Sequence, residues 1–202
     1  MNATAGRAAA MTARVLEAAA RAGIAEPGVR SIEAALDAAM QPRIRRLADD
    51  HDPAYLHPGR TVLILLEDAG VTDPAVLSAG ALTESLRPDL AAAPPAAVRL
   101  APDTLELLAE VPTPAHDRDT LLERLVSASA PARLVALAER LDHVRHLHLL
   151  GRSHWAPLHR ETRDIYLPVA DRTDPTLARR LRYWCTTFAE RFLPDAGTRR
   201  AD

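Results

Sequence analysis

The sequence contains no lysine, and it has only one asparagine, one cysteine and very few aromatic residues. All 25 basic residues are therefore arginine. A lysine Schiff base and a Walker-type phosphate loop both need an ammonium group, so these two enzyme classes are excluded. The single cysteine, Cys185, excludes an internal disulfide and any multi-cysteine zinc site, and it suits a reducing compartment.

Neither sign of charge dominates, because 25 basic residues are matched by 27 acidic ones. The chain thus lacks the positive field that nucleic acid or an anionic membrane would require, and we expect neither as a partner. Residues 1–20 are rich in alanine but are interrupted by Arg7, Arg14 and Glu17, so they fit neither a signal peptide nor a spanning helix. We expect a cytoplasmic protein.

The fold class follows from what the chain has in place of strand-forming residues. Runs of β-branched and aromatic residues are scarce, and 16 prolines punctuate apolar segments of helical period. We predict one all-α domain over residues 1–202, a bundle of about eight or nine helices, with a surface linker at 90–102 and a disordered tail at 195–202. The predicted helices span 8–23, 30–48, a segment opening at 57, 74–82, 103–111, 118–128 and 131–150, with two more closing the chain.

The helix predicted at 131–150 carries the most informative pattern. Glu139, His143 and His146 follow the spacing of one face, which is flanked by Ala132, Val135, Ala136 and Leu150. The opposite face carries Leu134, Leu137, Leu141, Val144 and His148. Apolar residues on nearly all sides indicate a buried helix, where an unpaired carboxylate costs several kcal/mol. Two interpretations stay open at this point: a satisfied polar network in the core, or the wall of a functional site.

Four segments in order carry a resemblance to a known family. Residues 54–58 are similar to a Pro-Tyr-Ile-x-His-Pro segment, and residues 77–84 to Leu-x-Ala-Ala-Leu-Leu-His-Asp. Residues 134–145 are similar to Leu-x-Lys-Leu-Ala-Asp-Arg-Leu-x-Asn-x-Arg, and residues 161–172 to Glu-Thr-Leu-x-Ile-Tyr-x-Pro-Leu-Ala-x-Arg. Over residues 30–172 the chain thus resembles the HD-superfamily hydrolase domain of RelA/SpoT-type enzymes and of the small stand-alone alarmone hydrolases.

The resemblance implies a divalent metal, usually manganese, and cleavage of the 3′-pyrophosphate of guanosine tetra- or pentaphosphate. The ligand positions of that family are occupied here by His57, Thr83, Glu84 and Glu139. Threonine is a poor ligand, and the family's acid–base Glu-Asp pair is matched by residues 87 and 88, an arginine and a proline. We therefore expect no metal or other cofactor; the alternative is manganese held by His57, Glu84 and Glu139, with His143 as a disfavoured substitute ligand.

The function expected from these substitutions is a non-hydrolytic HD-type domain. It would bind a small molecule or nucleotide, or perform metal-free acid–base catalysis in a recycled cleft, in specialised metabolism. The alternatives are a metal-dependent pyrophosphohydrolase acting on (p)ppGpp or another nucleotide, and a regulatory, antitoxin-like interaction protein. The candidate catalytic residues are Glu84, Glu139, His57 and His143, and the candidate substrate-binding residues are Arg46, Thr83, Tyr166 and His146.

The remaining reactive side chains receive no catalytic role. Cys185 shares an apolar stripe with its neighbours, which predicts an inert buried thiol. The same C-terminal stripe offers a homodimer or partner face if it proves exposed, through Trp184, Phe188 and Phe192. Four histidines are expected to be exposed in loops or near helix ends: His51, His116, His154 and His159.

Overall fold

The computed structural model describes residues 3–46, 53–86, 100–112 and 117–193. These residues form helices and contain no β-strand, which confirms the all-α prediction. The α-helices are α1 (Ala3–Arg21), α2 (Glu26–Arg46), α3 (His57–Leu63), α4 (Pro74–Leu82), α5 (Pro102–Glu110), α6 (Arg118–Ser127), α7 (Ala130–Arg145), α8 (Trp155–Glu161), α9 (Leu167–Thr173) and α10 (Pro175–Phe192). A π-helical turn at Thr162–Tyr166 joins α8 to α9 without a break, so the described residues make nine helices.

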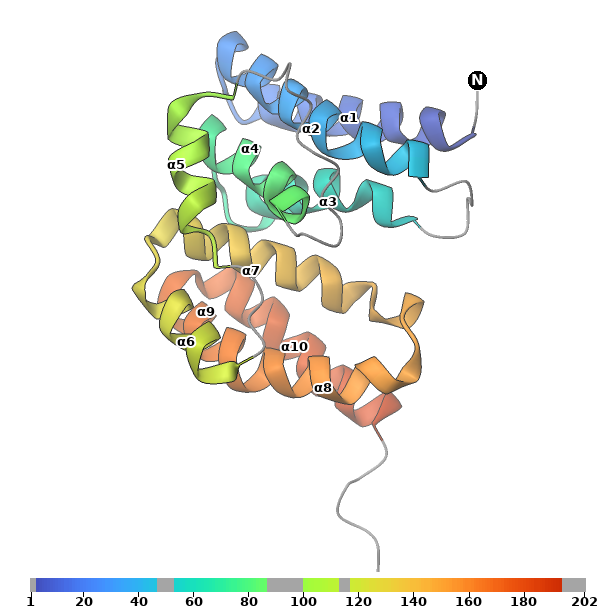
Figure 1. The fold of residues 1–202 in the computed structure, drawn as a ribbon, viewed down its shortest axis with the longest axis vertical. Coiled ribbons are helices and arrows are strands. Elements are labelled where there is room, and N and C mark those ends of the chain that lie inside the picture. The colour runs from blue at the N-terminus through green and yellow to red at the C-terminus, as the bar shows by residue number, and fades with distance from the viewer. Residues whose placement is uncertain (1–2, 47–52, 87–99, 113–116, 194–202) are drawn as a thin grey trace, which may run out of the picture.

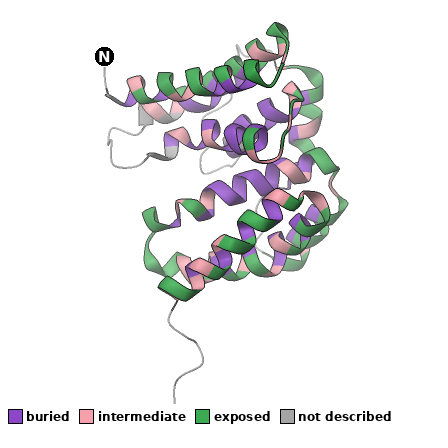
Figure 2. Ribbon diagram, turned by 180° about the vertical axis from the view of Figure 1, so that it is seen from behind, coloured by how far each residue is buried: buried purple, intermediate pink, exposed green. Residues whose placement is uncertain are grey.

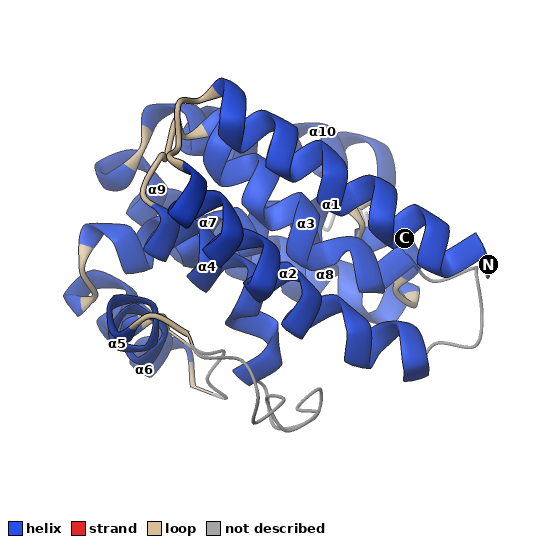
Figure 3. Cartoon of the chain, turned by 90° about the horizontal axis from the view of Figure 1, so that it is seen from above, coloured by secondary structure: helices blue, strands red, loops and turns tan. Residues whose placement is uncertain are grey.

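The helices are stacked in layers on either side of α7 (Figure 1). Helices α1 and α2 form the outer layer on one side, and α3 and α4 lie between them and α7. On the other side α9 and α10 pack against α7, with α8 beside them. Figure 1 and Figure 3 place α5 and α6 at the same flank of these layers but at different levels, α5 beside α4 and α6 beyond α7. Helix α7 therefore has one face toward each half of the molecule.

Helices α4 and α7 form the interior. Every residue from Val76 to Leu82 is buried, and α7 is buried over most of its length, as the purple ribbon in Figure 2 shows. A helix without charged residues, such as α4, must be covered on all sides, which explains its place at the centre. Helix α7 is buried although it carries Glu139, Arg140 and Asp142. The apolar run that follows His57 is likewise buried as far as Leu66. From Ile64 the backbone is π-helical, in the segment Ile64–Asp68.

Local capping signals fix where several helices begin. Asp73, Asp117, Ser129 and Asp174 each accept a hydrogen bond from a backbone N–H two or three residues further on. Such a cap stabilises a helix by about 1 kcal/mol. Proline follows in the first turn of α4, α7 and α10, where its missing N–H costs nothing.

Two glycines allow the helices around the site to approach one another closely. A Cβ on Gly59 would lie 2.3 Å from Cγ of Met11 in α1, and one on Gly80 would lie 2.5 Å from Cδ1 of Leu65. Both distances are shorter than a real carbon contact. The absence of a side chain at these positions thus brings α3 against α1, and α4 against the segment that continues α3.

Three predicted helix boundaries are wrong. The first helix starts at Ala3 rather than at 8, because alanine favours the helix even where the apolar pattern is weak. The second starts at Glu26 rather than at 30, with Pro27 in its first turn, where the missing N–H costs nothing. Helix α7 ends at Arg145 rather than at 150. His146 has left the helical conformation, with ψ at 14°, and its ring bonds back to the carbonyl of Asp142. The chain continues as a 3-10 turn at Leu147–Leu149, so His148 is not part of α7.

The predicted linker at 90–102 lies outside the described residues except for its last three, and α5 begins at Pro102. The predicted tail at 195–202 lies outside them entirely. Within the described ranges, no helix has the length and apolar character needed to cross a bilayer.

Candidate functional site

Four side chains from three elements come together at one point of the structure. His57 opens α3, Glu84 lies in the 3-10 turn Thr83–Leu86 that extends α4, and Glu139 and His143 lie one turn apart on α7. One potential ligand atom from each lies within 4.8 Å of the others. The sequence therefore identified all four members of this group, which we call the His–Glu cluster.

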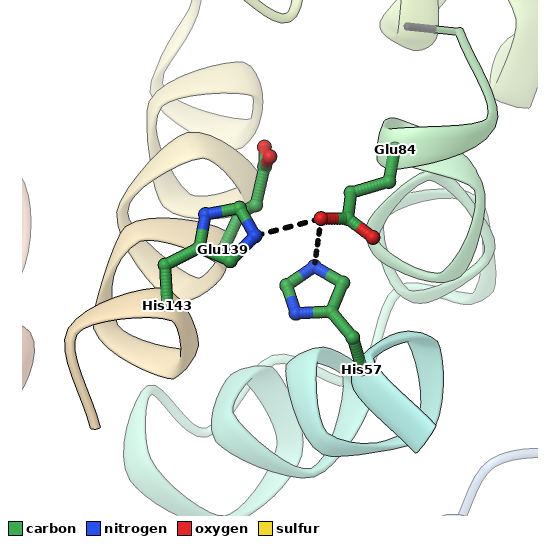
Figure 4. Close-up of side chains that lie close together, drawn as sticks. All are labelled: His57, Glu84, Glu139 and His143. Carbon is green, nitrogen blue, oxygen red and sulfur yellow. Dashed lines mark hydrogen bonds and ion pairs between the residues drawn. The ribbon is translucent and has the colours of Figure 1, made fainter. Parts of the chain in front are cut away.

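One carboxylate oxygen of Glu84 faces the edges of both imidazole rings of the cluster, as the dashed lines in Figure 4 show. Its Oε1 is 2.7 Å from Nε2 of His143, a hydrogen bond, and 3.7 Å from Nε2 of His57. The rings of His57 and His143 stack with their centroids 4.6 Å apart and their planes 12° from parallel. Both rings thus present a nitrogen to the same carboxylate oxygen.

Glu139 is the member of the cluster that lacks a partner. The residue is only 6% exposed, and no hydrogen bond or ion pair joins its carboxylate to another side chain in the part of the chain that the structure describes. A buried carboxylate without a compensating donor or cation is costly. With the imidazoles neutral, no member of the cluster offsets the charge of Glu139, so the cluster favours a cation.

A second group of hydrogen-bonded side chains surrounds Nδ1 of His57, the ring nitrogen that does not face Glu84. Nδ1 of His57 is 2.7 Å from Oδ2 of Asp142, which is only 1% exposed. Arg60 donates to the same carboxylate from Nε at 2.8 Å and from Nη2 at 2.9 Å, and Nδ1 of His146 lies 3.3 Å from its Oδ1. Burial raises the pKa of Asp142, but hydrogen bonds from His146, His57 and Arg60 outweigh it and hold the pKa well below its usual range.

The other predicted site residues lie outside the His–Glu cluster. The hydroxyl of Thr83 donates to the carbonyl of Ala79 in its own helix at 2.7 Å, so it is committed to the backbone. His146 donates from Nδ1 to the carbonyl of Asp142 at 2.8 Å, and its side chain is 30% exposed. The side chain of Arg46, like residues 87 and 88, is outside the described part of the structure.

Tyr166 is buried on the other side of α7 from the cluster. It contacts the face of α7 that carries Arg140. The guanidinium of Arg140 lies 4.0 Å from the centroid of its ring and is hydrogen-bonded to Glu161. Burial raises the pKa of Tyr166. Tyr166 therefore packs against Arg140 in a buried group rather than beside the His–Glu cluster.

Two residues of the site were not singled out from the sequence. Asp142 and Arg60 contact each other across 82 residues of chain. The available signal was their spacing: Arg60 lies one turn after His57, and Asp142 lies next to His143 on a helix already predicted to be buried. The pairing itself depends on how α3 crosses α7, which no local pattern specifies.

The expectation that His159 is exposed is wrong. His159 is 6% exposed, and its Nε2 donates to the carbonyl of Cys185 at 2.9 Å. Its ring packs against Phe188 and Trp184, because α8 lies on the aromatic stripe of α10. His154 is exposed as expected, and His51 and His116 lie outside the described residues.

Cys185 and the aromatic stripe behave largely as the sequence indicated. Cys185 is 5% exposed, and burial raises the pKa of its thiol to about 11. Of the residues suggested as a dimer or partner face, Phe188 is buried, Trp184 is half-buried and Phe192 is 53% exposed.

Comparison with known proteins adds no family to this geometry. No protein-family model matches the chain, and a search of the curated proteins finds no significant match. Function must therefore be argued from the His–Glu cluster itself.

Proposed function

We propose that the His–Glu cluster binds one divalent transition-metal ion and that the protein is a metal-dependent hydrolase. The observation that carries the proposal is Glu139, a buried carboxylate with no partner among the described residues that lies within reach of two imidazoles and a second carboxylate. Two imidazoles with two carboxylates suit Mn²⁺, Fe²⁺ or Zn²⁺ better than Mg²⁺ or Ca²⁺, which prefer oxygen ligands.

The spacing of the four side chains fits such an ion. Two ligand atoms that are each about 2.1 Å from a metal can be at most about 4.2 Å apart. The four atoms lie within 4.8 Å of one another, so the most distant of them would have to approach by more than half an ångström to reach bonding distance. The hydrogen bond between Glu84 and His143 would open, and the cation would replace its proton.

His143 is the reason this proposal departs from the expectation drawn from the sequence. Thr83 occupies a family ligand position, but its hydroxyl is hydrogen-bonded to the backbone of its own helix. His143 lies four residues after Glu139 and therefore on the same face of α7, and it restores a fourth donor beside His57, Glu84 and Glu139. The ligand count that the resemblance implies is thereby kept with a different set of residues.

The choice of metal separates a catalytic from a structural site. Zn²⁺ with four protein ligands is normally a closed structural centre, whereas a six-coordinate ion such as Mn²⁺ would keep two positions for water and substrate. A bound ion would supply a nucleophilic water at neutral pH and polarise a phosphoryl oxygen. The resemblance favours a phosphate ester or anhydride of a nucleotide as the substrate, with guanosine tetraphosphate as the first compound to test.

The test is metal content, measured by elemental analysis on protein purified without chelator and again after soaking in Mn²⁺ and gel filtration. We expect about one metal per chain, lost in Glu84→Ala and in Glu139→Ala. Glu67→Ala is the matched control, because Glu67 is a surface carboxylate with a side chain 43% exposed. Release of phosphate or pyrophosphate from guanosine tetraphosphate should then depend on the same metal.

No bound metal in the soaked wild-type protein would overturn the proposal. Metal that survives in both cluster variants would place it elsewhere and overturn it equally. Metal without hydrolysis of any nucleotide would retain the centre and reject the hydrolase.

The hydrogen bond between Glu84 and His143 supports a second candidate, metal-free acid–base chemistry. A buried carboxylate 2.7 Å from an imidazole is an arrangement that can hold and transfer a proton. This function would persist after complete removal of metal by a chelator and would be lost in His143→Gln. A chelator-sensitive activity would eliminate it.

A further inference from the structure

Among the described residues, the carboxylate of Asp142 reaches the side chains of the His–Glu cluster through one hydrogen bond, to Nδ1 of His57. We propose that Asp142 is a positioning residue, which holds His57 in the tautomer whose unprotonated Nε2 faces the cluster. The inference rests on the proposed metal centre, because it explains how His57 becomes a ligand. The resemblance assigns no role to position 142, which matches one of its unspecified positions.

The position of the proton on His57 follows from its neighbours. Arg60 is always charged, and it binds both oxygens of Asp142 in a fork, at 2.8 Å and 2.9 Å. A carboxylate held in this way can only accept, so the 2.7 Å contact requires Nδ1 of His57 to donate. A neutral imidazole has one N–H, and Nε2 is then left with a lone pair.

The contacts at Nε2 agree with that assignment. Oε1 of Glu84 is 3.7 Å away, beyond hydrogen-bonding distance, which suits two acceptors facing one another. Thr61 is fully buried beside the ring, and its hydroxyl, 3.4 Å from Nε2, can donate toward the lone pair. Nε2 is therefore the nitrogen available to a cation.

The two histidines of the cluster differ in this respect. Nε2 of His143 is hydrogen-bonded to Glu84, and no carboxylate holds its other nitrogen within the described residues. His57 has a carboxylate that is 1% exposed and is itself held by Arg60 and His146. Metal-binding histidines commonly donate their second N–H to such a group, which fixes the ring and its tautomer.

The first experiment reads the tautomer in the metal-free wild-type protein, by two-bond ¹H–¹⁵N correlation NMR on ¹⁵N-histidine-labelled protein, with His57→Gln to assign the signals. We expect His57 to carry its proton on Nδ1. A proton on Nε2 would overturn the proposal. This measurement needs no variant of Asp142 to fold and does not depend on metal binding.

The second experiment measures Mn²⁺ affinity by calorimetry in the full-length protein. Asp142→Asn should weaken binding about 10- to 100-fold, the effect usual for such an outer partner of a ligand. Asp68→Asn is the matched control: Asp68 is also a largely buried carboxylate with two arginine partners, Arg145 and Arg180, but it does not contact His57. Its affinity for Mn²⁺ should change less than twofold.

A double-mutant cycle separates positioning from general loss of structure. In a His57→Ala background, Asp142→Asn should cause no further loss of Mn²⁺ affinity, because its effect passes through His57. An additional loss there as large as in the wild type would contradict the proposal. If the wild type binds no Mn²⁺ while His57 still carries its proton on Nδ1, the metal centre fails and the hydrogen bond to Asp142 stands.

Discussion

Glu139 and Arg140 are neighbours on α7, and they point into different halves of the molecule. Both residues are 6% exposed. Arg140 is hydrogen-bonded to Glu161 and stacks on Tyr166, whereas Glu139 has no such partner among the described residues. Burial of a charge is common to both halves. The difference in neutralisation is what distinguishes a candidate site from a structural contact.

In the half with α6 and α8–α10, which we call the lower half, the buried charge of Arg140 is already paired with Glu161. Burial lowers the pKa of Arg140, but the neighbouring Tyr166 and Glu161 raise it more, so the guanidinium stays charged. In the other half, the upper half with α1–α4, the cation Arg60 is paired with Asp142, and Glu139 has no cation partner among the described residues. The comparison predicts that removing the charge of Glu139 and removing the charge of Arg140 or Glu161 have opposite effects on stability.

The largest effect is expected from Arg140→Ala. Removing the guanidinium strips Glu161 and Tyr166 of their partner and leaves a cavity, which should cost about 3 kcal/mol of unfolding free energy. Urea denaturation measures it, with Arg182→Ala as the control, because Arg182 forms an exposed pair with Asp171. Equal losses in the two variants would show that the Arg140 group is not a structural anchor.

Metal binding in the upper half should raise the unfolding free energy of the protein by about as much as Arg140→Ala lowers it. At a hundredfold excess of free Mn²⁺ over its dissociation constant, the unfolding free energy should rise by about 2.7 kcal/mol. The rise in melting temperature should vanish in Glu139→Gln and persist in Glu161→Gln. A rise of the same size in Glu139→Gln would mean that the ion acts elsewhere.

A smaller effect of opposite sign is expected from Glu139→Gln without metal. The amide removes a desolvated charge and its repulsion from Glu84, so the metal-free protein should gain about 1 kcal/mol of stability. Glu161→Gln should lose stability, because Arg140 then lacks its anion. If both variants shift in the same direction, the two halves do not differ as described.

The smallest effect concerns Cys185, in the lower half. Burial raises the pKa of its thiol from 9.0 to about 11, so the folded protein keeps the thiol protonated where the unfolded chain has begun to form thiolate. Stability should therefore decrease slightly as pH rises above 9. At pH 8, a thiol reagent should label native protein about 100-fold more slowly than protein in urea. Fast native labelling would show that this half opens readily.

Much of the fold could be predicted because its signals are local. Asp73 followed by Pro74 starts α4, and the same pair at 174 and 175 starts α10. The helical spacing of Glu139 and His143 placed both on one face of α7. His57 and Glu84 needed the resemblance in addition, because they come from separate elements.

What the sequence did not provide depends on contacts between distant segments. Asp142 lies 85 residues from His57, and their hydrogen bond depends on the crossing of α3 and α7. His159 is buried because α10 covers it, which its own neighbourhood in the sequence does not indicate. The early end of α7 reflects the bond from His146 to the carbonyl of Asp142, which competes with continued helix.

The most direct test of the metal centre is anomalous diffraction from crystals grown with Mn²⁺, recorded on both sides of the manganese absorption edge. We predict one anomalous peak bounded by His57, Glu84, Glu139 and His143, with Nδ1 of His57 still bonded to Asp142. A map without a peak in the cluster, at a Mn²⁺ concentration that saturates any other site, would contradict the account.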